Sequence, residues 1–192
     1  MITKILEQLF VESRTQNGYL DEPLQDSVLR QLYEALKWGP TSMNCGPARF
    51  AFVRTVQARQ QLAECVSPGN AVKVLQAPVT VVIGMDLAFH DHLPRLFPHK
   101  DVRPMYVDNP GLVESTAFRN SSLQGAYLMM AARALGLGCG PMSGFDAVQV
   151  DGLIWKDRPV RTNFLCALGH GDPSKVLGRS PRLAFDEACQ LL

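Results

Sequence analysis

LVESTAFRNSSLQGAYLMMAARALG, residues 112–136, is the segment on which the architecture of this chain depends. It predicts one long helix, and after Leu123 apolar residues cover much of its circumference. A chain of 192 residues could hardly cover such a helix by itself, so we expect it to be both a core helix and a dimer interface. The longest nearly apolar run, residues 126–139, contains Arg133 and is shorter than the roughly 20 residues that span a bilayer.

The sequence before this helix predicts alternating helices and strands. Apolar residues at helical spacing follow Asp26, the expected cap, and stop at the breaker pair Gly39-Pro40. Continuous valine and isoleucine in residues 77–86 are typical of a central strand covered on both faces. The other expected elements are a first helix near the amino terminus, a strand over residues 48–55, a helix capped by Thr55 and a short helix over residues 67–76.

The segment 87–111 contains four prolines and three histidines without regular periodicity, which is typical of a lid or a binding segment. After the long helix, residues 136–146 predict a strand that runs into a turn, and residues 162–171 predict the last strand. Residues 180–192 predict a basic turn and a short helix.

Composition favours one compact domain, residues 1–192, with 46% hydrophobic residues. A net charge of +1 with mixed signs disfavours nucleic acid and membrane surfaces as partners. Five scattered cysteines without a C-x-x-C pair argue against a disulfide framework and fit a reducing compartment. The amino terminus lacks the features of a signal peptide, so we expect a cytoplasmic protein.

Basic and amide side chains near both ends of the chain suit a terminal phosphate, because arginine can bind it in a bidentate manner. They are Arg14 and Asn17 after the first helix, and Arg179 and Arg182 in the carboxy-terminal turn. Solvated surface charge is the alternative interpretation.

Two further groups of polar residues could contact a flat ligand. In GPTSMNCGP, residues 39–47, a turn presents Thr41, Ser42 and Asn44, although an ordinary connection would use the same residue types. Asn70 and Lys73 share one helix face, where they could meet a ligand oxygen that gains negative charge, or form a plain surface pair.

GLGCGPMSGFD, residues 136–146, has glycines that allow a backbone to approach a ligand closely. It follows a long helix and contains a proline, so it is a weak match to a dinucleotide-binding fingerprint. The histidines and aspartates of residues 90–101 fit no standard metal spacing, and we expect no metal. A covalent role for Cys45 with His170 as base has no support from spacing.

Taken in order, these motifs resemble the nitroreductase family over nearly the whole chain. The resemblance implies an α+β sandwich, with a mixed, mainly antiparallel sheet flanked by helices, in an interlocked homodimer that binds FMN. It also implies NADH or NADPH as electron donor. The FMN-binding positions that it implies are Arg14, Thr15, Asn17, Pro40, Thr41, Ser42, Asn44, Asn70, Lys73, Pro141, Met142, Ser143, Gly144, Arg179 and Arg182.

KWGPTSMNCGPARF, LFPH, STAFRNSS, ALGLGCGPMSGFD and GHGDPSK resemble the malonic semialdehyde reductase subgroup of that family. The resemblance implies reduction of a small 3-oxo acid to 3-hydroxypropanoate. Gly46 and Ala48 depart from the usual glutamine and tryptophan and remove bulk near the ring. The acid needs a cation, for which Arg103 and Arg119 are the candidates. A broad nitro or quinone reductase and a non-catalytic flavin-binding protein are the alternatives.

Overall fold

A four-stranded antiparallel sheet forms the centre of the protein in a computed structural model that describes residues 3–192. The strand order is β1-β2-β4-β3, and each neighbouring pair is antiparallel. The parallel contribution is an isolated bridge between Thr15 and Cys139. The strands are β1 (Ala48–Val53), β2 (Val79–Asp86), β3 (Gly138–Met142) and β4 (Val160–Gly169).

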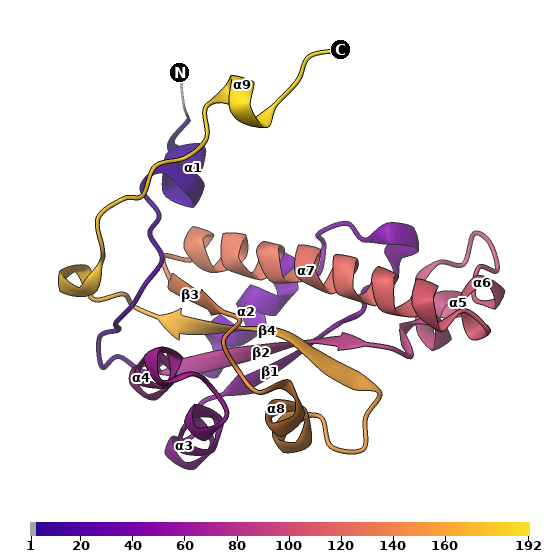
Figure 1. The fold of residues 1–192 in the computed structure, drawn as a ribbon, viewed down its shortest axis with the longest axis horizontal. Coiled ribbons are helices and arrows are strands. Elements are labelled where there is room, and N and C mark those ends of the chain that lie inside the picture. The colour runs from indigo at the N-terminus through magenta and orange to yellow at the C-terminus, as the bar shows by residue number, and fades with distance from the viewer. Residues whose placement is uncertain (1–2) are drawn as a thin grey trace.

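Helices cover both faces of this sheet, as Figure 1 shows. Helices α2 (Asp26–Leu36) and α7 (Pro110–Ala134) pack on one face. Helices α3 (Val56–Glu64), α4 (Pro68–Gln76) and α8 (Ala147–Ile154) cover the other. The expected α+β sandwich is therefore confirmed.

Strand β2 is buried along its whole length, which explains its uninterrupted apolar sequence. Val81 and Ile83 point into the cluster beneath α2 and α7, whereas Val82 points into the cluster beneath α3, α4 and α8. Successive side chains of a strand face opposite ways, so both faces of a doubly covered strand must be apolar.

Two expected helix caps have different outcomes. Thr55 caps α3 as predicted, because its hydroxyl accepts a hydrogen bond from the Ala58 N–H at 3.2 Å. The assignment of Asp26 as a cap was wrong by one position: Gln25 is the N-cap and Asp26 is the first helical residue. Its carboxylate pairs with Arg54 instead.

The segment after β2 packs against the amino-terminal end of α7. Phe89, Tyr106 and Val113 form a third buried cluster with Cys45 there. Apolar packing therefore attaches this segment to the rest of the protein. It contains three short helices: η3 (Phe89–His92), α5 (Leu93–Leu96) and α6 (Pro104–Val107).

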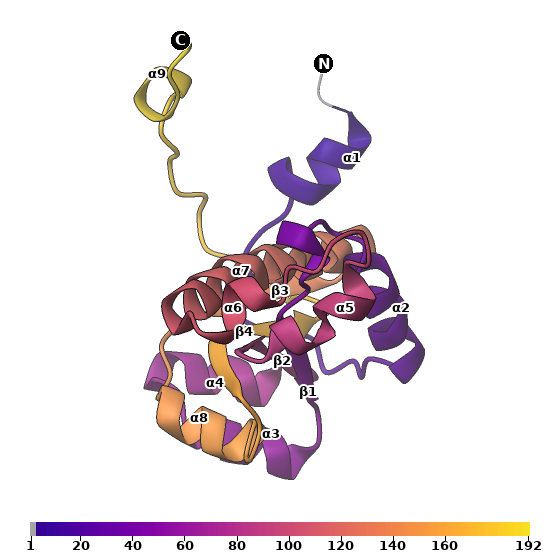
Figure 2. The ribbon, with the colours of Figure 1, turned by 90° about the vertical axis from the view of Figure 1, so that its right-hand side faces the viewer.

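Both ends of the chain project from the same side of the body, in the view of Figure 1 and in the turned view of Figure 2. The first helix is α1 (Lys4–Leu6) continued by η1 (Glu7–Val11), and the first two residues of the predicted helix lie outside the described residues. The carboxy-terminal segment contains η4 (Pro173–Lys175) and α9 (Phe185–Ala188). Within residues 3–192, no helix has the length and apolar character needed to cross a membrane.

Candidate functional site

The two ends of the chain enclose a cavity of about 690 Å³. Arg14, Thr15 and Asn17 line it from the amino-terminal side, and Arg179 and Arg182 line it from the carboxy-terminal side. A guanidinium N–H of Arg14 donates to the Leu177 carbonyl, and one of Arg179 donates to the Val11 carbonyl. The structure therefore brings together the four residues that the sequence predicts for a phosphate, Arg14, Asn17, Arg179 and Arg182, and adds Thr15 beside them.

Arg133 also lines this cavity and was not expected there from the sequence. It comes from the last turn of α7, and its Nη1 donates to the Leu9 carbonyl at 2.7 Å. Its Nε is buried and has no hydrogen-bond partner among the described residues. No carboxylate in residues 3–192 forms an ion pair with any of these four arginines, so the cavity holds uncompensated positive charge. A dianionic phosphate matches such a donor set.

Strand β3 connects this cavity to the second group of candidates. The Gln16 N–H donates to the Cys139 carbonyl at 2.9 Å, which places the segment after Arg14 alongside β3. A Cβ on Gly140 would lie 2.8 Å from the Gln16 carbonyl, so glycine is needed for this close approach. The other end of β3 leads directly into residues 143–145.

Gly144 contacts the beginning of α4. Its carbonyl accepts hydrogen bonds from the Ser67 N–H at 2.9 Å and from Asn70 Nδ2 at 3.0 Å. A Cβ on Gly144 would lie 2.9 Å from Ser67 Oγ and 3.0 Å from Asn70 Nδ2, so a side chain would displace this contact. Lys73 lies one turn further along α4 and is half-buried. The candidates of α4 and of residues 141–144 thus form one group.

Within that group, Met142 differs from its neighbours. Pro141 and Ser143 are exposed, whereas the Met142 side chain is buried in the core beneath α3, α4 and α8. Only the backbone of Met142 can therefore face a ligand on the exposed side.

The loop over residues 40–46 has an unusual backbone. Met43 and Asn44, within the short helix η2 (Ser42–Asn44), have φ angles of 50° and 52°, and Gly46 has 45°. Residues other than glycine rarely adopt this left-handed backbone conformation. It is retained where the surrounding structure holds the residue in place.

Three polar side chains of α7 hold this loop. Asn120 Oδ1 accepts from the Ser42 N–H, Gln124 Oε1 accepts from the Ala48 N–H, and the Tyr127 hydroxyl donates to the Pro40 carbonyl, each at 2.8 Å. These residues are spaced by four and three positions, so they lie on one face of the helix. Their role was not predicted from the sequence, although polar residues at this spacing in an otherwise apolar helix could have indicated it.

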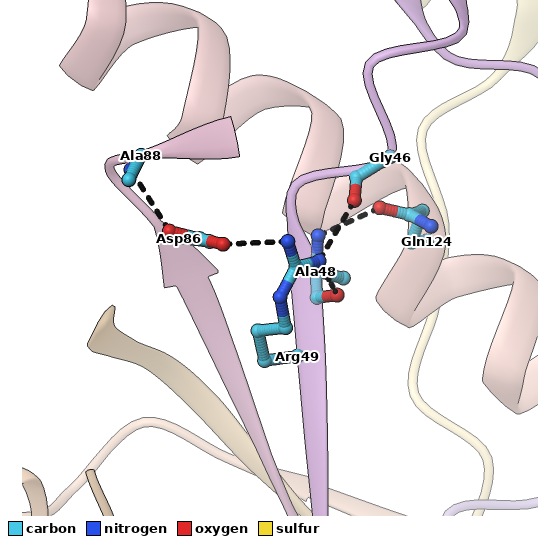
Figure 3. A network of polar contacts seen from close by, with 6 residues as sticks. All are labelled: Gly46, Ala48, Arg49, Asp86, Ala88 and Gln124. Carbon is cyan, nitrogen blue, oxygen red and sulfur yellow. Dashed lines mark hydrogen bonds and ion pairs between the residues drawn. The ribbon is translucent and has the colours of Figure 1, made fainter. Parts of the chain in front are cut away.

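Arg49 fixes the end of the same loop, as Figure 3 shows. Its Nη2 lies 2.5 Å from Asp86 Oδ2, and its Nη1 donates to the carbonyls of Gly46 at 3.0 Å and Ala48 at 2.9 Å. The other Asp86 oxygen accepts from the Ala88 N–H at 2.8 Å. This pair, in which Asp86 is buried and Arg49 is partly exposed, joins the loop to the segment that follows β2.

Thr41 and Asn44 are held within this region. The Thr41 hydroxyl accepts from the Gly46 N–H at 3.1 Å, and Asn44 Nδ2 donates to the Leu96 carbonyl at 2.8 Å. Among the described residues, no hydrogen bond joins the loop to Asn70 or Gly144. Within one chain, the loop is therefore not tied to the Asn70–Gly144 group by any hydrogen bond of the described residues.

The two candidate cations for a carboxylate have different surroundings. Arg103 forms hydrogen bonds to Asp91 Oδ1, from Nε at 3.0 Å and from Nη2 at 2.7 Å, and this guanidinium lowers the pKa of Asp91. Arg119 is exposed on α7 and lies outside the cavity bounded by the two chain ends.

The structure does not favour covalent catalysis by Cys45 with His170 as base. Cys45 is fully buried, and burial raises the pKa of its thiol to about 11, which disfavours the nucleophilic thiolate. His170 lies 3.8 Å from Glu22, outside the cluster that contains Cys45. Within residues 3–192, no three His, Cys, Asp or Glu side chains gather as a metal-binding group.

A family profile and individual proteins that resemble this chain point to the same family. The sequence profile of the family described as Nitroreductase family matches residues 12–170. A protein of Burkholderia lata, named in the class NADH dehydrogenase/NAD(P)H nitroreductase, is 53% identical over 186 residues, covering 97% of this chain and 95% of its own. A protein of Ralstonia pickettii with the same class name is 52% identical over 189 residues, covering 97% and 96%.

Among solved structures, a protein from Exiguobacterium sibiricum titled as a nitroreductase in complex with FMN has a TM-score of 0.87. It is 20% identical, and the match covers 100% of this chain and 99% of that one. At this identity the likeness shows a shared fold.

Proposed function

Because this chain belongs to the nitroreductase family, whose profile matches most of its length, we propose that it is an FMN-dependent oxidoreductase. It takes electrons from NADH or NADPH and passes them to a small organic acceptor. The observation that carries the proposal is the arginine-lined cavity. The segment after Arg14 is hydrogen-bonded to β3, and the other end of β3 leads to Gly144 and its hydrogen bond with Asn70.

The donor set fits FMN on two counts. Four arginines without acidic partners among the described residues suit the phosphate, and the buried, unpartnered Nε of Arg133 is a free donor beside it. Gly140 and Gly144 allow β3 and the residues after it to lie close to Gln16 and to the beginning of α4, so the phosphate cavity and Asn70 adjoin the same strand.

FMN supplies the hydride chemistry when it is bound. Arg14, Arg179 and Arg182 bind its phosphate, with Thr15 and Asn17 as further polar contacts. Asn70 and Lys73 provide an amide and an ammonium that favour negative charge at the pyrimidine edge. The backbone of residues 141–144 orients the ring.

A homodimer completes this site in our proposal. The loop of residues 40–46 is held by hydrogen bonds to α7, and among the described residues it forms none with Asn70 or Gly144. A second copy could bring its own Pro40, Thr41, Ser42 and Asn44 to the flavin. The exposed apolar residues Trp38, Phe118 and Leu123 support an interface on this side of the molecule.

The acceptor in our proposal is a small 3-oxo acid such as malonic semialdehyde, which the enzyme reduces to 3-hydroxypropanoate. A broader nitro or quinone reductase is the second candidate, and the names of the relatives support it. The five free cysteines fit a cytoplasmic, reducing location.

The first test is a visible spectrum of the purified protein, followed by anaerobic addition of NADH and then NADPH. We expect flavin absorbance that one donor bleaches, and that malonic semialdehyde or a quinone restores. Protein that neither carries flavin nor binds added FMN would contradict the proposal. Flavin that neither donor reduces would identify a flavin-binding protein without this activity.

A further inference from the structure

We propose that Arg95 binds the carboxylate of an acidic acceptor, in a second cavity beside the loop of residues 40–46. This inference rests on the proposed function and names the specificity residue of the same site. The cavity has a volume of about 820 Å³, within the usual range of small-molecule sites.

The position of the cavity links it to the acceptor. Asn44 and Gly46 line it from the loop that we assign to the flavin of the partner protomer, and Ala48 lines it from the beginning of β1. Gly46 and Ala48 add little side-chain volume to this cavity, which leaves room for a small acceptor. Arg95 and His92 also line the cavity, from the segment after β2.

Arg95 is fixed next to the loop through its neighbour. Asn44 Nδ2 donates to the Leu96 carbonyl at 2.8 Å, so α5 and the loop keep a defined separation. The residue that follows Arg95 is therefore hydrogen-bonded directly to a candidate flavin contact. A carboxylate bound by Arg95 would place the rest of a short acceptor near that loop.

The charges of the cavity single out Arg95. Lys37 is paired with Glu34, and Arg49 is paired with the buried Asp86. Arg95 forms no ion pair with any carboxylate of residues 3–192, and no acidic side chain lines the cavity. An arginine without an internal partner is the group that can bind a carboxylate without first losing another one.

The same reasoning ranks Arg95 above the two arginines expected from the sequence. Arg103 is already occupied by Asp91, and Arg119 does not line this cavity. Neither residue combines a free charge with a position beside the loop.

The test measures malonate binding to the FMN-loaded protein by calorimetry, with neutral malonamide as the second ligand. The variants are Arg95→Ala, Arg95→Lys and, as a matched control, Arg30→Ala, which removes an exposed arginine of α2 outside this cavity. We expect Arg95→Ala to weaken malonate binding about 10-fold or more, since a charge-assisted contact is lost. Arg95→Lys should weaken it less, and Arg30→Ala should match the unaltered protein.

Malonate binding that is unchanged in Arg95→Ala, reduced equally in Arg30→Ala, or absent from the unaltered protein would overturn the inference. Loss of bound flavin in both Arg95 variants would also overturn it. Bleaching of the flavin by NADH is measured separately in each variant, so failure of the proposed oxidoreductase activity is distinguished from failure of the carboxylate site.

Discussion

Arg49 and Asp86 form a charged pair at the end of the loop, with side chains that are 23% and 8% exposed. Removing one member of a buried pair leaves the other charge without compensation. We expect Arg49→Met to lower the free energy of unfolding by about 3 kcal/mol, measured by urea denaturation at neutral pH.

The exposed pair Arg161–Glu114 provides the matched control, because both side chains are more than half exposed. Arg161→Met should change stability by less than about 1 kcal/mol. If both substitutions changed the free energy of unfolding equally, the charge of buried Asp86 would not need compensation by Arg49.

Individual site residues were predictable where a motif contained them, and hidden where they act through tertiary contacts. Arg14 and Arg182 come from recognisable segments, and the structure places both in one cavity. Asn120 and Arg133 lie inside an apolar helix, and their partners are far away in sequence. Residue type and spacing alone do not specify such partners.

Close packing between α7 and β4 depends on Gly125. A Cβ at this position would lie 2.3 Å from Cζ and 2.5 Å from Cε1 of Phe164, so the aromatic ring would have to move. Overpacking of this kind costs about 1–3 kcal/mol, and we expect Gly125→Ala to lower the thermal unfolding midpoint accordingly.

Gly152 in α8 is the control, because a Cβ there would meet no atom within 4 Å. Alanine is the better helix former by up to about 1 kcal/mol, so Gly152→Ala should raise the midpoint. A Gly125→Ala protein at least as stable as the parent would contradict the packing argument.

Most elements were predictable because their periodicity was strong, and the exceptions have physical reasons. Strand β2 and helix α7 were expected from continuous apolar sequence. Helix α8 was not expected, since it has eight residues, an internal glycine and little contrast between its faces. The start of α2 was misplaced because Arg54, which pairs with Asp26, lies 28 positions further along the chain.

The assembly that we propose depends on the exposed face of α7. Phe118 is 55% exposed there, whereas Val148 is 82% exposed on α8, on the opposite side of the sheet. We expect Phe118→Asp to shift the protein from dimer to monomer in sedimentation velocity and to reduce its bound FMN, because a charge would be buried without a partner.

Val148→Asp should leave both the sedimentation coefficient and the flavin content unchanged. If Phe118→Asp remained dimeric with full flavin, the interface would have to lie elsewhere. The sequence predicted a dimer from the apolar circumference of one helix, and that dimer stays a prediction. The hydrogen bonds that tie the loop to α7, and Asn70 to Gly144, became visible only in three dimensions.

The arginine-lined cavity is closed by contacts between residues very distant along the chain: Arg14 with Leu177, 163 positions apart, and Arg179 with Val11, 168 positions apart. During translation, a nascent chain that ends near residue 170 already contains all four strands but only one wall of this cavity. If this cavity binds the cofactor as we propose, we expect cofactor capture to wait until the last segment has left the ribosome. Yellow colour from bound FMN would then distinguish completed chains from chains truncated near residue 170. A protease cut after residue 171 would release FMN while the four-stranded sheet stays intact.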